Sequence, residues 1–338
     1  MADGRSVSKK AGKGFAQDRY EKMRYRRCGR SGLMLPAISL GLWQSLGRQG
    51  NAAECRRCVC YAFDHGVTHF DLANNYGPPP GNSEIVFGRI LRQMPRDELI
   101  VSTKAGWGMW PGPYGDWGGK KYLVASLDQS LKRMGLEYVD IYYHHRPDPQ
   151  TPLEETLGAL DLIVRQGKAL YAGVSSYSGG QFLSAVETVS RRGWTPITIH
   201  QPYYNMLSRG VEKDLLPHTA AAGTGVIAFC PLAQGMLTDK YLEGLPKGSR
   251  FSAAGRKWYD EQAQAGVWTK TGALNRVARA RGQTLAQMAL TWLLRDERVT
   301  SALIGASRVE QVRENLQAAS AAPLTAEELQ KIDEILAV

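Results

Sequence analysis

The sequence lacks any long uninterrupted hydrophobic run. No stretch approaches the roughly 18–20 apolar residues that a membrane-spanning helix requires. The N-terminal segment contains no apolar core of the kind that secretory signals carry. These absences argue against a membrane-bound or secreted protein. We therefore expect a cytoplasmic protein with no membrane partner.

Cysteine is scarce, because only five are spread over 338 residues. They are Cys28, Cys55, Cys58, Cys60 and Cys230. A chain of this length can bury enough apolar surface to fold without disulfides, so the odd number favours a reducing compartment. Three of the cysteines fall in one amphipathic helical pattern, and no second cysteine or histidine pair completes a tetrahedral zinc site. We expect free thiols and no metal.

Negative charge is scarce at the N terminus. The first 30 residues hold ten lysines and arginines against three acidic residues, which accounts for most of the net charge of +10. We interpret residues 1–22 as a disordered, solvated basic tail. A nucleic-acid-binding arm is the alternative, but the chain shows neither zinc-finger spacing nor interleaved aromatic and basic residues. We therefore expect no nucleic-acid partner.

A regular alternation of strand and helix patterns fills most of the remaining chain. The strand-like segments are Ala37–Trp43, Thr68–Ala73, Leu99–Lys104, Val139–His145, Leu170–Ser176, Ile197–Tyr203, Val226–Leu232 and Thr300–Ala306. The helical patterns are Ala52–His65, Ser83–Gln93, Tyr122–Met134, Leu153–Gln166, Gln181–Arg191 and Asp214–Ala222. Nearly continuous apolar strands are typical of a parallel sheet that is covered on both faces. Eight such strands predict an α/β fold, a (β/α)8 TIM barrel, as one domain over residues 23–338.

Three segments interrupt this alternation. Residues 23–36 contain an Arg-Ser-Gly turn signal and predict a β-hairpin that caps the bottom of the barrel. Residues 105–121 and 233–261 follow the third and seventh strands and predict long loops at the end where barrel enzymes hold their sites. The first of these loops is rich in Gly, Pro and Trp. It forms either a packed lid or an apolar wall for a substrate.

Chemically active side chains gather at the predicted strand ends. Asp71 ends the second strand and Tyr76 follows it, Lys104 ends the third, and His144 and His145 end the fourth. An unperturbed tyrosine has a pKa near ~10, and a lysine cation about 4 Å away favours the phenolate by up to ~4 kcal/mol. Such a pair, oriented by a buried carboxylate, indicates proton exchange with a carbonyl oxygen while hydride reaches the carbon. Singly, each residue has an ordinary structural explanation.

Seven motifs, in order, resemble the aldo-keto reductase superfamily over about residues 23–320. They are THFDLANNYG, IVSTK, YVDIYYHHRPD, GVSS, IHQPYYN, IAFCPLAQGMLTDKY and LIGASRVEQVRENL. The resemblance implies a catalytic tetrad of Asp71, Tyr76, Lys104 and His145. Tyr76 would be the general acid in reduction, and His144 would face away from the pocket.

The same resemblance implies an NADP(H) site that needs no Gly-rich dinucleotide motif. Ser175 and Gln201 would hold the nicotinamide amide, and Phe229 would stack on its ring. The other implied cofactor residues are Trp43, Ser176, Cys230, Leu232, Gln234, Gly235, Lys240, Arg250, Gly305, Ser307, Arg308, Gln311, Glu314 and Asn315. Ser307 and Arg308 open a predicted helix whose first amides suit a phosphate, which favours NADP(H) over NAD(H). An ordinary capped helix is the alternative.

Residues 106–148 resemble the bacterial L-glyceraldehyde-3-phosphate reductase subgroup, which is related to the β subunits of voltage-gated potassium channels. That implies reduction of small aldehydes such as glyceraldehyde 3-phosphate or methylglyoxal, and a role in aldehyde detoxification. The implied substrate pocket is lined by Trp43, Trp107, Tyr114 and Trp117. Lys120 or Lys121 would supply a cation for a phosphate.

Two other functions stay open at this point. The chain is either an enzyme or an NADP(H)-binding regulatory subunit like the channel subunits, since such relatives keep the tetrad. As an enzyme it works either as a reductase or as an NADP-dependent alcohol or sugar dehydrogenase, because the same residues serve both directions. A homo-oligomer also remains open.

Overall fold

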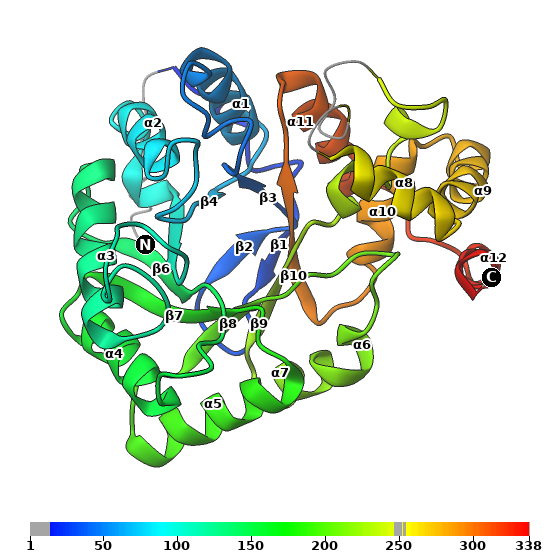
Figure 1. Ribbon diagram of the computed structural model, residues 1–338. Helices are drawn as coiled ribbons and strands as arrows, with labels where there is room; N and C mark the ends of the chain where they lie inside the picture. Colours follow the sequence, from blue (N-terminus) through cyan, green and yellow to red (C-terminus); the bar gives the residue numbers. More distant parts are fainter. Residues whose placement is uncertain (1–13, 247–251, 253–254, 338) are drawn as a thin grey trace, which may run out of the picture.

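Eight parallel strands form a closed barrel in a computed structural model that describes residues 14–246, 252 and 255–337 (Figure 1). The strands are β3 (Ile38–Gly41), β4 (His69–Asp71), β5 (Ile100–Ala105), β6 (Val139–His144), β7 (Ala169–Ser175), β8 (Ile197–Gln201), β9 (Gly225–Phe229) and β10 (Val299–Gly305). They pair in this order, and β10 closes on β3. The predicted (β/α)8 barrel is confirmed, with a strand in each predicted segment.

Helices surround the barrel (Figure 1). Those between strands are α1 (Ala52–Asp64), α2 (Asn82–Leu91), α3 (Lys120–Met134), α4 (Leu153–Arg165), α5 (Gly179–Arg192), α6 (Val211–Asp214), α7 (Leu216–Ala222), α8 (Arg256–Gln264), α9 (Val267–Ala280) and α10 (Leu285–Leu293). The helices α11 (Val309–Leu316) and α12 (Ala326–Ala337) end the chain. Short 3-10 turns are η1 (Arg96–Glu98), η2 (Ala233–Gly235), η3 (Asp239–Tyr241) and η4 (Gln317–Ser320). Five of the six predicted helices are confirmed as single elements.

The sixth predicted helix is divided into α6 and α7. Pro217 occupies the first turn of α7, where its missing N–H costs nothing. The same proline could not lie inside one continuous helix without removing a backbone hydrogen bond. The chain therefore restarts its helix at Leu216.

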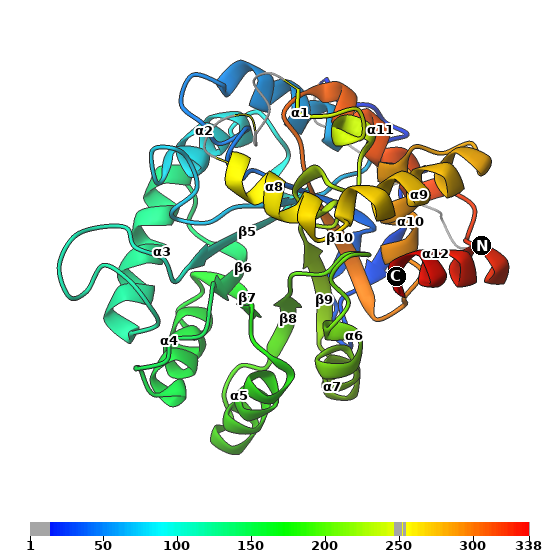
Figure 2. The same ribbon diagram turned by 45° about the vertical axis from the view of Figure 1, so that its right-hand side comes forward.

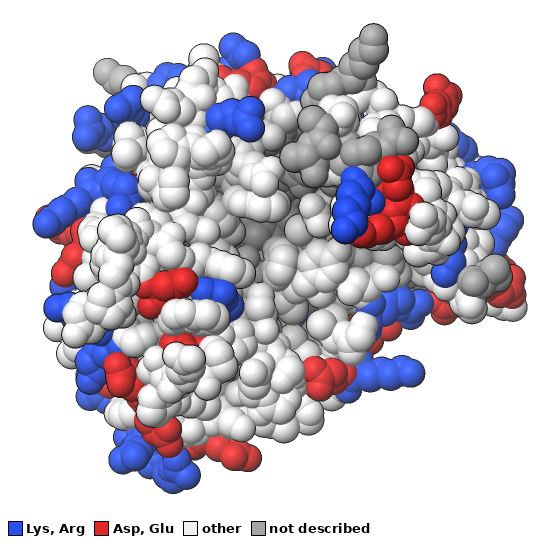
Figure 3. All heavy atoms as spheres, viewed as in Figure 1, with Lys and Arg blue, Asp and Glu red and all other residues white. Residues whose placement is uncertain are grey.

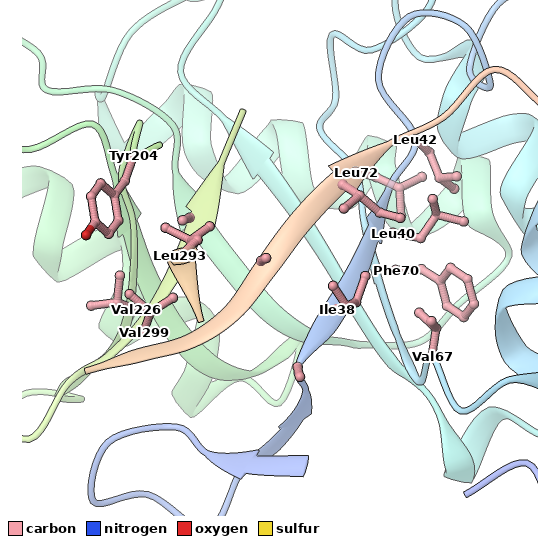
Figure 4. Close-up of a cluster of buried hydrophobic side chains, with 14 of the residues drawn as sticks. Ile38, Leu40, Leu42, Val67, Phe70, Leu72, Tyr204, Val226, Leu293 and Val299 are labelled. Atoms are coloured by element: carbon pink, nitrogen blue, oxygen red, sulfur yellow. The ribbon is translucent and has the colours of Figure 1, made fainter. Parts of the chain in front are cut away.

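The predicted hairpin closes the bottom of the barrel. It consists of β1 (Tyr25–Arg27) and β2 (Met34–Pro36), which pair antiparallel. Cys28 and Leu35 are buried there against apolar side chains from inside the barrel, Tyr143 among them. A larger core lies between the strands and the helices, and Figure 4 shows part of it beside β3 and β4. The barrel is therefore filled at its lower end, which leaves the opposite end for a site.

The N-terminal segment differs from its prediction over residues 14–22. Phe15 packs edge-on against Phe63 with ring centres 4.9 Å apart. The backbone N–H of Ala16 donates to Asp64 Oδ1 at 2.8 Å, and buried Arg19 pairs with Glu98. This part of the predicted disordered tail is packed on the barrel. Residues 1–13 of the predicted tail lie outside the described residues.

The segment 233–261 also differs from its prediction as a loop, because it contains η2, η3 and the start of α8. Figure 2 shows α8 lying beyond the carboxyl ends of β8 and β9, so the segment does reach the expected end of the barrel. The sequence likewise predicted no helix at α9 or α10. The whole of α10 is buried, so it carries no amphipathic period that would mark it. Among the described residues, none of the helices has both the length and the apolar character to cross a membrane.

Candidate active site

Four side chains predicted to act together meet at the carboxyl end of the barrel. Lys104 Nζ lies 2.5 Å from Asp71 Oδ2 and donates to Leu72 O at 2.6 Å. The same nitrogen is 5.1 Å from the centre of the Tyr76 ring. The rings of Tyr76 and His145 meet edge to face with centres 5.9 Å apart. Strands β4, β5 and β6 are hydrogen-bonded neighbours, which is why residues distant in sequence converge here.

The positive charge of Lys104 is balanced inside the site. Both Lys104 and Asp71 are buried, at 0% and 1% side-chain exposure. Burial lowers the pKa of Lys104 from its usual value, while the Asp71 charge and hydrogen bond oppose that change. A buried charge of this kind persists only when it is paired. The tyrosine therefore faces an ion pair instead of an isolated cation.

Tyr76 consequently behaves differently from the sequence-based expectation. Burial raises the pKa of its phenol well above 10, and the charges of Asp71 and Cys230 raise it further. This environment does not lower the pKa of Tyr76 as expected, because the negative charge of Asp71 neutralises that of Lys104 at 2.5 Å. Tyr76 is thus protonated throughout the physiological pH range. A permanently protonated phenol is a loaded proton donor.

His145 is held neutral beside this phenol. Burial lowers its pKa well below the usual 6.5, and the cations of Lys104 and Arg146 lower it further. Its Nδ1 is buried and has no hydrogen-bond partner among the described residues. Its backbone N–H donates to Ala105 O at 2.9 Å. Next to that carbonyl, Gly106 has a φ of 154°, and a Cβ there would lie 3.0 Å from the Cβ of His145.

His144 has a separate environment. Its Nδ1 lies 2.8 Å from the hydroxyl of Tyr177, on the far side of β6 from the site. Burial lowers the pKa of His144 to about 4. Successive residues of a strand point to opposite faces, so His144 turns outward as the resemblance implied.

A chain of buried polar groups supports Asp71 from inside the barrel. Ser301 Oγ lies 2.7 Å from Ser39 Oγ, which is 2.9 Å from His69 Nδ1. His69 Nε2 is 3.0 Å from Ser102 Oγ, and Ser102 donates to Asp71 Oδ1 at 2.6 Å. All five residues are at most 1% exposed. No solvent is needed to satisfy these groups.

The direction of this chain follows from its acceptor end. An ionised carboxylate only accepts, so Ser102 donates its single hydroxyl hydrogen to Asp71. Ser102 must then accept from His69 Nε2, which fixes the proton of the neutral imidazole on Nε2. Nδ1 is left as an acceptor for the Ser39 hydroxyl. The charge state agrees, because burial lowers the pKa of His69 to about 4.

His69 and Ser102 were not predicted as functional residues. Each precedes a tetrad member by two positions on the same strand, His69 before Asp71 and Ser102 before Lys104. Side chains two apart on a strand share a face. Polar residues at that spacing inside a barrel were the available signal.

Tyr122 joins the loop that carries Tyr76 to the loop that follows β5. Its hydroxyl accepts from Asn74 Nδ2 at 3.0 Å, and it donates to the backbone carbonyl of Trp107. Asn74 lies in the loop that carries Tyr76, and Trp107 opens the Trp-rich segment after β5. Tyr122 itself is 2% exposed. The hydroxyl therefore links the predicted proton donor to the predicted substrate wall.

The predicted substrate-pocket residues occupy different distances from the tetrad. The Trp43 ring is centred 6.3 Å from Tyr76, and the Trp107 ring is centred 6.3 Å from His145. Trp117 instead stacks on Arg146 at 3.6 Å, and Tyr114 lies 5.0 Å from Lys121 Nζ. Trp43 and Trp107 thus lie at the tetrad, whereas Trp117 and Tyr114 lie farther along the loop.

Figure 3 shows the surface of the face that Figure 1 presents. A hollow opens near the centre of this face, and its walls are almost free of charged side chains. Lysine, arginine and acidic side chains lie around it instead (Figure 3). An uncharged hollow with a few polar groups at its base is typical of a small-molecule site.

Gln201, a predicted cofactor residue on β8, contacts Asp71 across the barrel, and the predicted residues Ser175 and Phe229 end the two strands beside β8. Gln201 Nε2 donates to Asp71 Oδ1 at 3.3 Å, and Ser175 Oγ donates to Gln201 O at 2.8 Å. The next strand ends at half-buried Phe229, whose ring is 5.5 Å from that of Tyr203. Exposed Ser176 follows Ser175 with a φ of 62°. These groups lie at the carboxyl ends of three adjacent strands of the barrel.

Strained backbone is confined to this end of the barrel. In the described ranges, the non-glycine residues with positive φ are Gln44, Trp117, Ser176, Cys230, Ala233 and Gln234. Every one of them lies in a loop that follows a barrel strand. Such conformations persist where the surroundings enforce them, commonly at functional sites. Cys230, Gln234 and Gly235 of the predicted cofactor set fall in the loop after β9, together with Leu232 and exposed Lys240.

The predicted cofactor residues Ser307, Arg308 and Gln311 lie at the start of α11. Ser307 is exposed, and its N–H and Oγ both bond to Gln311 Oε1, at 2.7 and 3.0 Å. The N–H of Val309 donates to Glu54 Oε1 at 3.1 Å. The protein thus caps some of the amides expected to meet a phosphate. Arg308 is exposed and its nearest carboxylate is 3.6 Å away, on Glu310.

Four other predicted cofactor residues do not lie at the start of α11. Gly305 ends β10 and is exposed, whereas Asn315 is buried on α11 and Glu314 beside it is half-buried. Arg250 lies outside the described residues. Glu54, which reaches the start of α11 from α1, was not predicted.

Comparison with known proteins agrees with this arrangement. The model of the Aldo/keto reductase family matches residues 37–337. The chain is 55% identical to the L-glyceraldehyde 3-phosphate reductase of Escherichia coli K12, over 95% of this chain and 94% of that protein. It is 36% identical to a protein of Arabidopsis thaliana named "Probable voltage-gated potassium channel subunit beta", over 93% of this chain and 97% of that one. The chain therefore belongs to the aldo/keto reductase family and is an oxidoreductase.

Proposed function

We propose that the protein reduces small aldehydes with NADPH, with glyceraldehyde 3-phosphate or methylglyoxal as the type of substrate. The observation that carries the proposal is the placement of half-buried Tyr76 against the ring of His145 and above the Lys104–Asp71 ion pair, where desolvation raises the pKa of the phenol and keeps it protonated. The 55% identity to a protein named as a reductase of L-glyceraldehyde 3-phosphate supports the substrate class. The free thiols of this chain support a function in the reducing cytoplasm.

The residues beside the tetrad fit a nicotinamide cofactor. Half-buried Phe229 offers a ring face, and the neighbouring strands carry Ser175 and Gln201 for an amide group. Exposed Arg308 offers a cation for the additional phosphate of NADP(H). When bound, the nicotinamide supplies hydride to the carbonyl carbon.

The side chains of the tetrad divide the proton chemistry among them. The Tyr76 hydroxyl donates its proton to the carbonyl oxygen as negative charge develops there. Lys104, 5.1 Å from the ring centre, stabilises the phenolate that remains. Neutral His145 adds polarity beside the same oxygen without repelling Lys104. Asp71 keeps Lys104 charged and aimed throughout.

A regulatory subunit is the second candidate function. The 36% identity to a protein named as a potassium channel β subunit is the observation that favours it. Such a protein would hold NADPH in the same hollow and turn over slowly. The tetrad serves alcohol oxidation equally well, so the ratio of NADP⁺ to NADPH sets the direction.

The test measures NADPH consumption by the purified protein with glyceraldehyde 3-phosphate, methylglyoxal and a nitrobenzaldehyde. We expect the wild type to oxidise NADPH and Tyr76→Phe to lose about 10²- to 10⁴-fold in kcat, the range that a positioned proton donor contributes. Tyr143→Phe is the matched control, since Tyr143 is also buried near Lys104, at 5.6 Å, but inside the barrel. Full activity in Tyr76→Phe would overturn the mechanism. Tight NADPH binding without turnover on any aldehyde would favour the regulatory subunit.

A further inference from the structure

Arg146, the residue after His145, is held on several sides by the Trp-rich loop. Its guanidinium lies between two indole rings, 3.7 Å from the centre of Trp107 and 3.6 Å from that of Trp117. Its Nε donates to Gly106 O at 2.6 Å. Its Nη2 donates to both carboxylate oxygens of Asp116, at 2.9 and 3.1 Å. Sequence reasoning did not single out this arginine.

The remaining nitrogen, Nη1, has no hydrogen-bond partner within the described residues. The two indoles cover the faces of the guanidinium, so a further group can approach only in its plane. In-plane approach is the geometry in which a guanidinium binds the oxygens of a phosphate. The Arg146 side chain is 18% exposed, so a small anion can reach its edge. The left-handed φ of 69° at Trp117 shows that the loop accepts a costly backbone conformation there.

The position of Arg146 suits the far end of a short substrate. Trp107 contacts Arg146 with its face and meets the His145 ring edge-on at 6.3 Å. One indole thus separates the cation from the groups that would receive the carbonyl oxygen. A three-carbon aldehyde phosphate carries its anion at the opposite end from its carbonyl, so it needs a cation beside the tetrad and not within it.

The lysines predicted for the same role lie at the start of α3, away from the tetrad. Lys120 and Lys121 line a groove between α3 and α4, together with the carboxylates Asp128 and Glu155. None of the tetrad residues borders that groove. Lys121 also lines a second cavity, with Asp116, Trp117 and the carboxylates Asp148 and Glu155, and no tetrad residue borders that cavity either.

We propose that the Nη1 edge of Arg146 is the subsite for the phosphate of the substrate, and that Asp116 competes with that phosphate for the guanidinium. The inference rests on the proposed reduction of small aldehydes. Asp116 is 37% exposed and belongs to the loop, so its carboxylate repels an incoming anion while it orients the arginine. Arg146 selects the substrate and tethers the loop at the same time.

The test compares glyceraldehyde 3-phosphate with glyceraldehyde, which has the same carbonyl and lacks the phosphate. We expect Arg146→Met to lower the ratio of the two kcat/KM values by about 10- to 100-fold, as for a lost hydrogen bond to a charged group. Asp116→Asn should raise that ratio, through a lower KM for the phosphate ester. Lys121→Met tests the alternative cation, and Lys132→Met, an exposed lysine in the last turn of α3, is the matched control. Both should leave the ratio as it is in the wild type.

The outcomes separate this subsite from the proposed function. Parallel losses with both aldehydes in Arg146→Met would show that Arg146 only tethers the loop, and would overturn the subsite. So would a ratio that falls in Asp116→Asn, or one that falls in Lys121→Met but not in Arg146→Met. If the wild type reduces neither aldehyde, the proposed function itself fails. Thermal unfolding of each variant shows whether it is folded at the assay temperature.

Discussion

Asp71 accepts hydrogen bonds from three buried side chains. Lys104, Ser102 and Gln201 donate to its two oxygens at 2.5, 2.6 and 3.3 Å. The lysine depends on this carboxylate, because an unpaired buried ammonium loses its proton. In the proposed mechanism, the charge that stabilises a Tyr76 phenolate therefore depends on the hydrogen bonds to Asp71.

Replacing Ser102 by alanine tests this support. The change leaves His69 Nε2–H without its acceptor and removes one donor from Asp71. We expect the free energy of unfolding to fall by about 1–3 kcal/mol, the cost of a buried polar group left unpaired. We also expect kcat to fall with KM nearly unchanged, since the reacting groups are misplaced and not the substrate contacts.

Ser39→Ala is the matched control for that experiment. It removes a hydroxyl from the same chain, two links farther from Asp71. We expect similar destabilisation with a smaller loss in kcat. Nitrogen NMR of His69 checks the tautomer directly. A proton on Nδ1 instead of Nε2 in the wild type would contradict the direction of the chain.

The convergence of the four tetrad side chains was predictable from sequence, but the direction of the pKa shift of Tyr76 was not. Parallel strands in a barrel end at one mouth, so Asp71, Lys104 and His145 could be placed together from their strand ends alone. The pKa of Tyr76 depends on how closely Asp71 neutralises Lys104 and on how deeply the phenol is buried. Those distances are set by packing, which one sequence does not specify.

The loops after β4 and β5 act together through one buried hydroxyl. Tyr122, in the first turn of α3, bonds Asn74 from one loop and Trp107 from the other. Trp107 also contacts His145 and Arg146. A change in either loop is therefore transmitted to the other through Tyr122.

Tyr122→Phe should separate these two loops. The variant leaves the Asn74 amide and the Trp107 carbonyl unpaired, and we expect a loss of about 1–3 kcal/mol in the free energy of unfolding. We also expect kcat/KM to fall for every aldehyde, because Tyr76 and the Trp107 wall lose their common anchor. Steady-state kinetics and chemical denaturation measure the two effects.

Tyr142→Phe provides the comparison. Tyr142 is buried on β6 and donates to Leu123 O at 2.8 Å, so its hydroxyl bonds the backbone of α3 and neither of the two loops. It should lose comparable stability and retain its kcat/KM. Equal kinetic losses in the two variants would show that Tyr122 has no special coupling role.

Element prediction succeeded where a local pattern was strong. The apolar runs of the strands and the paired signals of α5, a Ser178–Gln181 capping box and a left-handed Gly193, mark their elements in the sequence. Prediction failed at α8, whose residues are mostly polar, and at α10, which is buried all round. Only tertiary packing decides such segments.

Across the whole molecule, buried histidines make stability depend on acid. Burial lowers the pKa of His69 and His144 to about 4 and the pKa of His200 to about 3. It also lowers the pKa of His145 well below 6.5. In the unfolded chain these groups bind protons below pH ~6.5, whereas in the folded protein they do not. The unfolded state therefore gains protons as the pH falls, and stability falls with it.

Chemical denaturation at pH 7 and pH 5 measures this dependence. Each histidine should cost up to about 1.4 kcal/mol per pH unit below its unfolded pKa. We expect a clearly lower free energy of unfolding at pH 5. His200→Phe should weaken the dependence by one proton, since His200 lies among the rings of Tyr177 and Phe182. Equal stability at the two pH values would show that these histidines are not buried in their neutral form.

The pH dependence of NADPH oxidation in a single turnover reports whether a protonated Tyr76 is the proton donor. With an uncharged aldehyde, we expect a wild-type rate that stays level from pH 6 to pH ~9. Burial raises the pKa of the Tyr76 phenol well above its usual value near 10, so the phenol stays protonated over this range. Tyr76→Phe should be slower by about 10²- to 10⁴-fold at every pH. Two results would contradict this role of Tyr76. One is a wild-type rate that falls with a midpoint near neutral pH, where the fall is lost in Tyr76→Phe. The other is a Tyr76→Phe rate equal to that of the wild type.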